Sequence, residues 1–347
     1  MRYKKQFFLL ITSMLMIAII GCSSSEATND NGGSATGNNN SETIEISYGH
    51  GFMPETPHHR AALMFKEQVE EKSNGQVEVE IFPSDQLGTA REQLEGLQMG
   101  TQQIALLPTA RISGTFPELQ LFDLPFLFPT REIGYAIMDG PVGENMLDKL
   151  ADNGIKGVAI YEDGFKHFTA NKELRKPEDF EGLKFRTMES PIVMGQFEQL
   201  GANPTVIDFG ELYNSLQQGV VDGQENPLVT IKNMKFYEVQ DYVTLSEHGY
   251  LGHVLMFDEN WFNSLSEDIQ EILVTTGKEL AKWQREEVQK EERDYLEEIK
   301  ESGTEVIELT DDERELFREA TLPVHEEYRE INSELLDRVY EEIENLQ

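Results

Sequence analysis

Residues 182–228 read GLKFRTMESPIVMGQFEQLGANPTVIDFGELYNSLQQGVVDGQENPL and contain the pattern that decides the fold. In GLKFRT, residues 182–187, apolar and basic side chains alternate with the two-residue period of a strand that has one buried face. A polar stretch follows, and Pro191 then occupies a position typical of the first turn of a helix. Arg186 is therefore the last strand residue before a turn, where its charge is either solvated or directed at a ligand.

The chain from residue 43 onward repeats this order of short strands and amphipathic helices. Further stretches with strand patterns are TIEISYG, QVEVEIF, QIALLP, GIKGVAIY, NPTVI and GHVLMFD. The alternation predicts an α/β fold with largely parallel sheets, divided into lobes. Residues 266–303 are helical almost throughout, with a bend expected near Gly277. About 25 residues of helix extend roughly 40 Å, so this helix is expected to bridge two lobes. A coiled-coil dimer is the alternative, but the apolar positions hold no strict heptad.

A weak internal repeat relates residues 92–108, EQLEGLQMGTQQIALLP, to residues 211–227, ELYNSLQQGVVDGQENP. Each copy contains Leu-Gln-x-Gly and ends at a proline the same distance beyond that glycine. We expect a helix to end at each glycine and to lead into a short strand that the proline terminates. Coincidence in Leu- and Gln-rich helices is the alternative. Because ligands bind outside the carboxyl ends of parallel strands, both proline-terminated ends and the Arg186 end are expected to face one cleft.

The net charge excludes some classes of partner. The chain has 29 Lys and Arg against 64 Asp and Glu, a formal charge of −35. Such a chain is not expected to neutralise the phosphates of a nucleic acid or to adhere to anionic lipid. An anionic ligand would need a local concentration of positive charge, because the global field repels it.

The N-terminus predicts export and attachment to a membrane. Residues 1–21 combine a basic start with an apolar run that is too short to span a bilayer, which is typical of a signal peptide. IIGC, ending at Cys22, resembles the lipobox of bacterial lipoproteins, and the resemblance implies that Cys22 is lipidated after cleavage. An uncleaved anchor is the alternative. Residues 22–42, rich in Ser, Asn and Gly, are expected to form a flexible tether on the extracytoplasmic face of the membrane.

No motif in the sequence indicates catalysis. Nucleophile-elbow, phosphate-loop and zinc-protease patterns are absent from the sequence, and Cys22 is the only cysteine. His58 and His59 point apart on a helix, so they are expected at the solvated surface rather than at a metal. We expect no enzyme activity, no cofactor and no metal.

Several motifs together resemble the substrate-binding proteins of TRAP transporters, the tripartite uptake systems for organic acids, in their DctP-like, four-carbon-dicarboxylate branch. These are residues 182–228, SDQLGTAREQLEGLQMG, DGFKHFTANKELRKPEDFEGLKFR and VDGQENPL, in that family's order and spacing. The resemblance implies a two-lobed, Venus-flytrap α/β fold of the periplasmic binding proteins, with a long helix that bridges both lobes. Lobe I is expected at 43–163 with about 252–275, and lobe II at 164–251 with about 276–347.

The same resemblance implies a set of ligand contacts. Arg186 matches the arginine that clamps the ligand carboxylate; a surface salt bridge is the alternative. Asn226 matches a second carboxylate contact, although the residues by themselves favour an Asn-Pro turn. Lys166 stands where the family commonly has arginine. Phe209 and Arg111 match positions at the pocket, with a core phenylalanine and an ordinary ion pair as alternatives.

The function implied by the resemblance is capture of a small organic acid, with a dicarboxylate favoured, and its delivery to the membrane subunits of a TRAP permease. A binding lipoprotein that feeds a chemoreceptor is the first alternative. A secreted enzyme on the same fold is the second. Hinges between the lobes are expected near 163–166 and 249–253, where Gly164, Gly249 and Gly252 lie.

Overall fold

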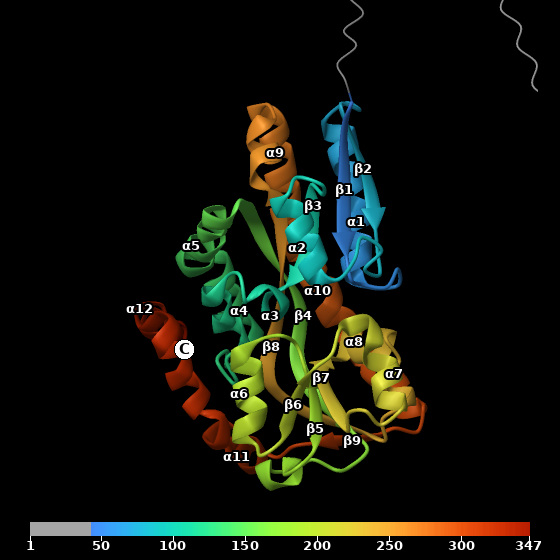
Figure 1. Ribbon diagram of the computed structural model, residues 1–347, viewed down its shortest axis with the longest axis vertical. Helices are drawn as coiled ribbons and strands as arrows, with labels where there is room; N and C mark the ends of the chain where they lie inside the picture. Colours follow the sequence, from blue (N-terminus) through green and yellow to red (C-terminus); the bar gives the residue numbers. More distant parts are fainter. Residues whose placement is uncertain (1–42) are drawn as a thin grey trace, which may run out of the picture. The chain divides into compact units, whose positions relative to one another are not determined.

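The computed structural model describes residues 43–347, which are built on one nine-stranded mixed sheet (Figure 1). The predicted signal peptide, tether and lipidated Cys22 lie outside the described residues. The order of the strands is β2-β1-β3-β8-β4-β7-β5-β6, and β9 pairs with β8. The strands are β1 (Ile44–His50), β2 (Val77–Phe82), β3 (Ile104–Pro108), β4 (Ile155–Ala170), β5 (Lys184–Thr187), β6 (Asn203–Val206), β7 (Gly223–Pro227), β8 (Tyr242–Asp258) and β9 (Glu305–Glu308).

Two long strands, β4 and β8, join the halves of this sheet. We call the half with β1, β2 and β3 lobe I and the half with β5, β6, β7 and β9 lobe II. Within each lobe these strands pair in parallel, as expected, whereas β4 and β8 pair antiparallel to each other, β8 to β3 and β4 to β7. The register of β4 against β8 shifts between Glu162 and Gly164. The two predicted sheets are therefore one continuous sheet, and the α/β two-lobed fold class is confirmed.

Helices cover the sheet, and several begin at caps that the sequence makes visible. Thr56 accepts a hydrogen bond from the backbone of α1 with Pro57 at the first position, and Thr89 forms a capping box with Glu92 at α2. The α-helices are α1 (Pro57–Lys72), α2 (Ala90–Gln98), α3 (Thr109–Ile112), α4 (Arg131–Asp139), α5 (Pro141–Lys149), α6 (Pro191–Gln199), α7 (Leu212–Gln217), α8 (Leu228–Asn233), α9 (Glu259–Ser264), α10 (Glu267–Glu301), α11 (Asp311–Thr321) and α12 (Pro323–Leu346). Short 3₁₀ turns are η1 (Pro117–Asp123), η2 (Leu150–Asn153), η3 (Pro177–Phe180), η4 (Phe209–Glu211) and η5 (Phe236–Glu238).

The internal repeat corresponds to a repeated structural unit, as predicted. In the first copy α2 leads through Gly100 into β3, and in the second copy α7 leads through Gly219 into β7. Both glycines have a left-handed backbone, with φ of 75° and 66°, which only glycine adopts at no steric cost. Both strands end at a proline.

Helix α10 bridges the lobes as a single element of 35 residues. Ile269 and Leu273 belong to a hydrophobic cluster of lobe I, whereas Tyr295 and Ile299 belong to one of lobe II. Helix α10 runs through Gly277 without a break, and the bend expected there stays a prediction. The glycine instead permits close packing: a Cβ there would lie 2.7 Å from Leu255 Cδ2 on β8.

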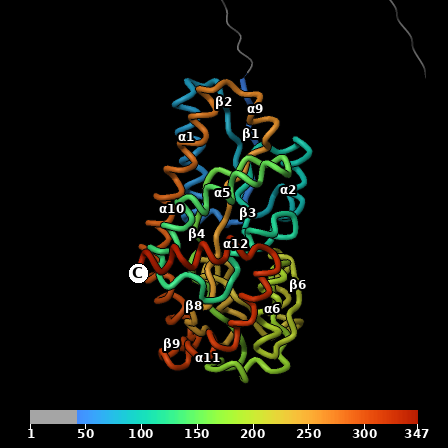
Figure 2. Tube along the Cα trace, turned by 90° about the vertical axis from the view of Figure 1, so that its left-hand side faces the viewer, coloured from blue at the N-terminus to red at the C-terminus, as the bar shows by residue number. Residues whose placement is uncertain are grey.

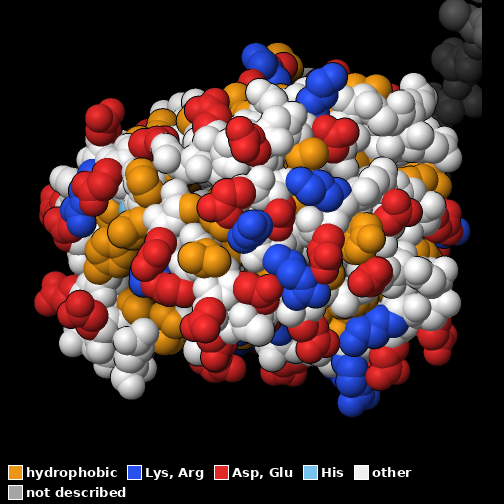
Figure 3. Space-filling view, turned by 90° about the horizontal axis from the view of Figure 1, so that it is seen from below, with side chains coloured by type: hydrophobic (Ala, Val, Ile, Leu, Met, Phe, Trp, Pro, Cys, Tyr) orange, Lys and Arg blue, Asp and Glu red, His pale blue; other side chains and the backbone are white. Residues whose placement is uncertain are grey.

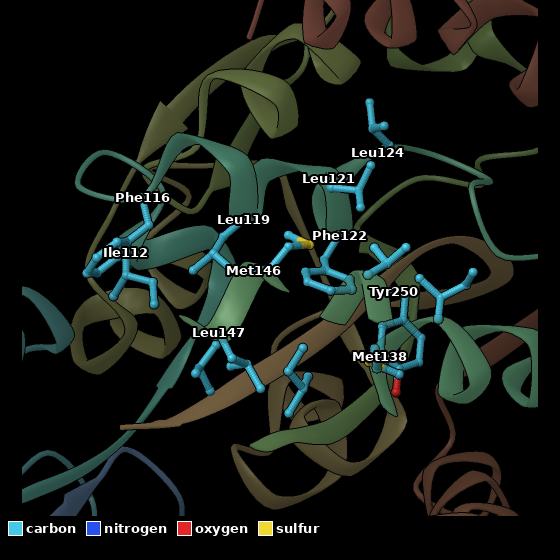
Figure 4. Packing of buried hydrophobic residues seen from close by; sticks show 14 of the residues in the cluster. Ile112, Phe116, Leu119, Leu121, Phe122, Leu124, Met138, Met146, Leu147 and Tyr250 are labelled. Atoms are coloured by element: carbon cyan, nitrogen blue, oxygen red, sulfur yellow. The ribbon is translucent and has the colours of Figure 1, made fainter. Parts of the chain in front are cut away.

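The C-terminal helix α12 returns across the molecule, as Figure 2 shows, between the end that holds β2 and the end that holds β9. Its residues Val324 and Leu336 join the largest core cluster together with residues of lobe I. Figure 4 shows members of this cluster, among them Phe122 and Tyr250. The resemblance places the C-terminal region, about 276–347, in lobe II. The described residues, 43–347, group into one compact unit, so the expected lobe boundaries stay a prediction.

Acidic side chains are distributed over the face of the molecule shown in Figure 3, with Lys and Arg interspersed among them. On this face the negative charge is therefore spread rather than gathered in one patch. Among residues 43–347 no helix combines the length and hydropathy needed to cross a membrane.

Candidate ligand-binding site

A pocket lies where the carboxyl ends of three strands meet. Pro108 at the end of β3, Arg186 in β5 and Asn226 in β7 all line it. The expected convergence of both proline-terminated strands and the Arg186 strand on one cleft is therefore present in the structure.

Arg186 is a buried charge with an unused donor. Phe185 points the other way into the lobe II core, so the strand period sends Arg186 toward the pocket. Its side chain is 1% exposed; Nε donates to the carbonyl oxygen of Ile207 at 3.0 Å, and Nη1 has no partner among the described residues. Burial and, to a lesser degree, Arg111 lower the pKa of Arg186 to about 9, so it remains charged at neutral pH. An unpartnered buried donor is costly, and an anionic ligand would satisfy it.

Arg111 lines the same pocket from lobe I. It follows β3 in the short helix α3, and its Nη2 donates to Asp208 Oδ1 of lobe II at 2.9 Å. The Asp208 side chain is 64% exposed, so this ion pair joins the lobes at the mouth of the pocket. Arg111 is consequently an intramolecular ion-pair partner as well as a pocket residue.

A carboxyl group and a neutral ring line the pocket where β4 pairs with β8. Asp163 of β4 lines the pocket, is 2% exposed, and accepts a hydrogen bond from the Thr230 hydroxyl at 2.9 Å. Burial raises the pKa of Asp163 to about 7, against the lowering effect of that hydrogen bond. His253 of β8 also lines the pocket, and its buried Nδ1 has no partner among residues 43–347. Burial, together with the charge of Arg111, lowers the pKa of His253 to about 3, so its ring is neutral.

A second carboxyl group, that of Asp85, lies in the loop after β2. Its backbone is left-handed, with φ of 56°, and Gln93 Nε2 donates to its Oδ1 at 3.3 Å. Burial raises the pKa of Asp85, although Arg111 lowers it. The pocket thus combines two guanidinium groups with two carboxyl groups from different elements.

The remaining predicted contacts fall into two groups. Asn226 and Phe209 line the pocket, and the Asn226 amide also donates to Gln224. Phe209 meets Phe236 edge to face at 6.3 Å. The structure therefore brings together Arg186, Arg111, Asn226 and Phe209.

Lys166 does not join this group. Its side chain is fully buried, and its Nζ donates to Glu225 Oε1 at 2.7 Å. His248 Nε2 lies 2.7 Å from the other oxygen of the same carboxylate. Glu225 and Asn226 are consecutive on β7 and so point to opposite faces of the sheet. Lys166 shares the face of Glu225 and is not among the residues that line the pocket.

Sequence reasoning missed Asp163, Thr230, His253 and Asp85. Acidic residues are so frequent in this chain that no single one stood out. The available signal was position: Asp163 immediately precedes Gly164, where the predicted hinge lies. The expectation that His58 is solvated is also wrong. Its Nε2 contacts the carbonyl oxygen of Glu162 at 2.6 Å, and its ring stacks on Phe52 at 3.6 Å.

No metal centre is evident in the described part of the chain. Among residues 43–347, no three His, Cys, Asp or Glu side chains are arranged to hold a metal ion. The arrangement offers hydrogen bonds and charge to a bound molecule.

Comparisons with known proteins agree with this arrangement. The family model DctP, described as bacterial extracellular solute-binding protein, family 7, matches residues 48–331. The chain is 37% identical over 293 residues to the C4-dicarboxylate-binding periplasmic protein DctP of Rhodobacter capsulatus, covering 84% of this chain and 88% of that protein. A TRAP periplasmic solute-binding protein from Sulfurospirillum deleyianum with bound succinate has a TM-score of 0.82 and 36% identity, covering 86% of this chain and 98% of that one. The sugar acid binding protein DctPAm from Advenella mimigardefordensis, in complex with galactonate, has a TM-score of 0.85 and 34% identity, covering 88% and 99%.

Proposed function

Because the chain belongs to family 7 of the bacterial extracellular solute-binding proteins, the TRAP solute-binding proteins, we propose that it captures a small organic acid through the carboxylate clamp Arg186. One observation carries this proposal: Arg186 is buried at the pocket and keeps a guanidinium nitrogen without a partner among residues 43–347. Arginine presents two parallel N–H groups that match a carboxylate. Members of this family are solute-binding proteins that act outside the cytoplasm.

The other pocket residues receive supporting roles. We assign Asn226 as a neutral donor to the same carboxylate, Phe209 as an apolar wall, and Arg111 as the residue that draws the anion in from lobe I. Closing the lobes would remove water and strengthen each charge-assisted hydrogen bond. Lys166 is assigned no contact with the ligand, because its ammonium group already donates to the Glu225 carboxylate.

Arg186→Ala tests the clamp. Truncating one partner of a desolvated ion pair costs about 2–5 kcal/mol, which lowers affinity by roughly thirty- to several-thousand-fold. Arg186→Lys should restore binding only in part, because a point charge lacks the two-pronged geometry. The measurement is calorimetric titration with acids selected by a thermal-shift panel of organic acids, because a bound ligand stabilises the native state.

Arg91→Ala is the matched control, since its side chain is 73% exposed on α2. Circular dichroism establishes that each variant is folded. Unchanged affinity in a folded Arg186→Ala protein would reject the clamp and the proposed function with it.

Delivery of the captured acid to the membrane subunits of a TRAP permease is the transport role that we propose. The name of the Rhodobacter capsulatus relative keeps a four-carbon dicarboxylate among the candidate ligands, and the galactonate complex keeps a sugar acid among them. Uptake of radiolabelled acid into vesicles that contain the permease should require this protein. Equal uptake without it would contradict the role.

We also propose that lipidated Cys22 attaches the protein to the extracytoplasmic face of the membrane. The support is the sequence IIGC after a short apolar run. A diacylated cysteine supplies the two chains that stable anchoring requires. Cys22→Ser should release the protein from the membrane fraction and remove the lipid mass from its N-terminal peptide. Retention in the membrane with an unchanged N-terminal mass would contradict anchoring.

A further inference from the structure

The charged side chains around the pocket provide one guanidinium group, that of Arg186, to pair with a ligand carboxylate. Arg111 already donates to the Asp208 carboxylate, and its charge also acts on Asp85. Arg186 is the guanidinium group of the pocket that no carboxylate of the described chain contacts, since its Nε bonds a backbone carbonyl and its Nη1 is unpartnered. A monoanion therefore finds a matching charge at Arg186, whereas the second carboxylate of a dianion would need another cation.

Asp163 of β4 and His253 of β8 form one side of the pocket, which we call its wall. The wall offers no such cation. The Thr230 hydroxyl donates its single hydrogen to the Asp163 carboxyl group, which can still accept further hydrogen bonds. His253 adds a neutral ring whose Nδ1 is buried and without a partner among residues 43–347. His58, from α1, lies 3.9 Å from Asp163 and is also neutral, because burial lowers its pKa. These groups are uncharged or negative.

Hydroxyl groups match this wall better than carboxylates do. A hydroxyl is a donor and an acceptor at once, so it can pair with Asp163 in either protonation state and with either tautomer of His253. A carboxylate only accepts, so it can pair with Asp163 only when that residue carries a proton. An ionised Asp163 would instead repel it, and a like charge in a desolvated site is costly.

We propose that the pocket selects a monocarboxylate that carries hydroxyl groups over a dicarboxylate of the same length. Arg186 holds the carboxylate, and Asp163 and His253 bind hydroxyls on the carbons beyond it. This assignment rests on the proposed carboxylate clamp and narrows its ligand class. It differs from the expectation of a dicarboxylate, which followed from the sequence resemblance.

Three four-carbon acids provide a matched set for the test. Butyrate has one carboxylate and no hydroxyl, succinate has two carboxylates, and erythronate has one carboxylate and three hydroxyls. Galactonate, with six carbons, extends the hydroxylated series in case the pocket requires a longer ligand. Calorimetric titration of the purified protein should give an affinity for a hydroxylated acid at least about tenfold above those for succinate and butyrate, the scale of one hydrogen bond to a charged group.

Asp163→Asn examines the wall itself. The amide oxygen can still accept from Thr230, but the negative acceptor is lost. The affinity for the hydroxylated acid should fall about 10- to 100-fold, while that for succinate should stay unchanged or rise. Asp152→Asn, at an exposed position of η2, is the matched control and should change neither. Circular dichroism verifies the fold of both variants.

The outcomes separate this inference from the clamp. Tighter binding of succinate than of either hydroxylated acid, with binding lost in Arg186→Ala, would overturn the inference and leave the clamp standing. Equal losses for succinate and the hydroxylated acid in Asp163→Asn would also overturn it, as would no binding of erythronate and galactonate to the wild type. Wild-type binding of these acids by folded Arg186→Ala would instead overturn the clamp.

Discussion

Lys166→Met should destabilise the protein strongly without abolishing ligand binding. Its ammonium group lies 2.7 Å from Glu225 Oε1, and both side chains are fully buried. Although burial alone would raise it, Lys166 and the hydrogen bond from His248 lower the pKa of Glu225 from 4.5 to about 2. The difference corresponds to about 3 kcal/mol of stability. Because the folded pKa is depressed, this contribution is present above about pH 4.5 and is lost as the pH falls toward 2.

Removing the lysine leaves a buried carboxylate without its partner, for which losses of about 3–5 kcal/mol are typical. Urea unfolding followed by far-UV circular dichroism measures the change. The double variant Lys166→Met/Glu225→Gln should recover part of the loss, because the uncompensated charge is gone. Lys290→Met, in an exposed pair with Glu287, is the control and should cost less than about 1 kcal/mol.

A loss below about 1 kcal/mol in Lys166→Met, or no recovery in the double variant, would refute this reasoning. A second outcome would restore the role predicted from the sequence: normal stability combined with a large loss of ligand affinity. Lys166→Arg should also destabilise, because Lys166 Cε lies 2.6 Å from where a Cβ on Gly249 would be, so the space is already filled.

All seven histidines among residues 43–347 have a lowered pKa, which is about 3 for His50, His167 and His253 and about 4 for His248, in each case mainly through burial. Below pH 6.5 the unfolded chain binds protons that the folded chain does not, so these last four alone should lower stability by about 2–3 kcal/mol per pH unit after subtraction of the opposite effect of Asp123 and Asp163, whose pKa burial raises to about 7. A urea midpoint at pH 5.5 equal to or above that at pH 7 would contradict this. Asp208→Asn should lower ligand affinity by up to about fivefold, because it removes an exposed ion pair between the lobes; calorimetry would contradict this if the loss reached that of Arg186→Ala. Gly277→Ala should cost about 1–3 kcal/mol in urea unfolding, because the added Cβ would overlap Leu255; equal or greater stability would show that α10 can shift.

Local patterns predicted the parts of the fold that local chemistry determines. The helix–glycine–strand–proline unit was predictable because Gly100 and Gly219 require a left-handed backbone and because prolines end strands. Of β4 and β8, however, only the apolar halves were visible as GIKGVAIY and GHVLMFD. Their other halves carry polar residues such as His167 and Thr244, which are buried by pairing within the sheet.

The same division applies to the site. Arg186 could be predicted because strand period and turn together fix its position. The pairing of Lys166 with Glu225 joins residues 59 positions apart, so no local pattern contained it. The place of Asp163 in the pocket wall depends on how β4 and β8, which are distant in the sequence, pair in the sheet. Composition and periodicity do not specify that pairing. The expected hinge at Gly164 stays a prediction, although the sheet register shifts beside it.

The continuous sheet has a consequence for the order in which the chain folds. Strand β8 pairs with both β3 and β4. Ile104 of β3 can therefore pair with Phe257, and Ile155 of β4 with Asp258, only after β8 has been synthesised. During synthesis the strands of lobe I are therefore made long before their neighbour emerges from the ribosome. Contacts of such high sequence separation slow folding and leave strand edges open in the nascent chain. The sheet can therefore close only after most of the chain has been made.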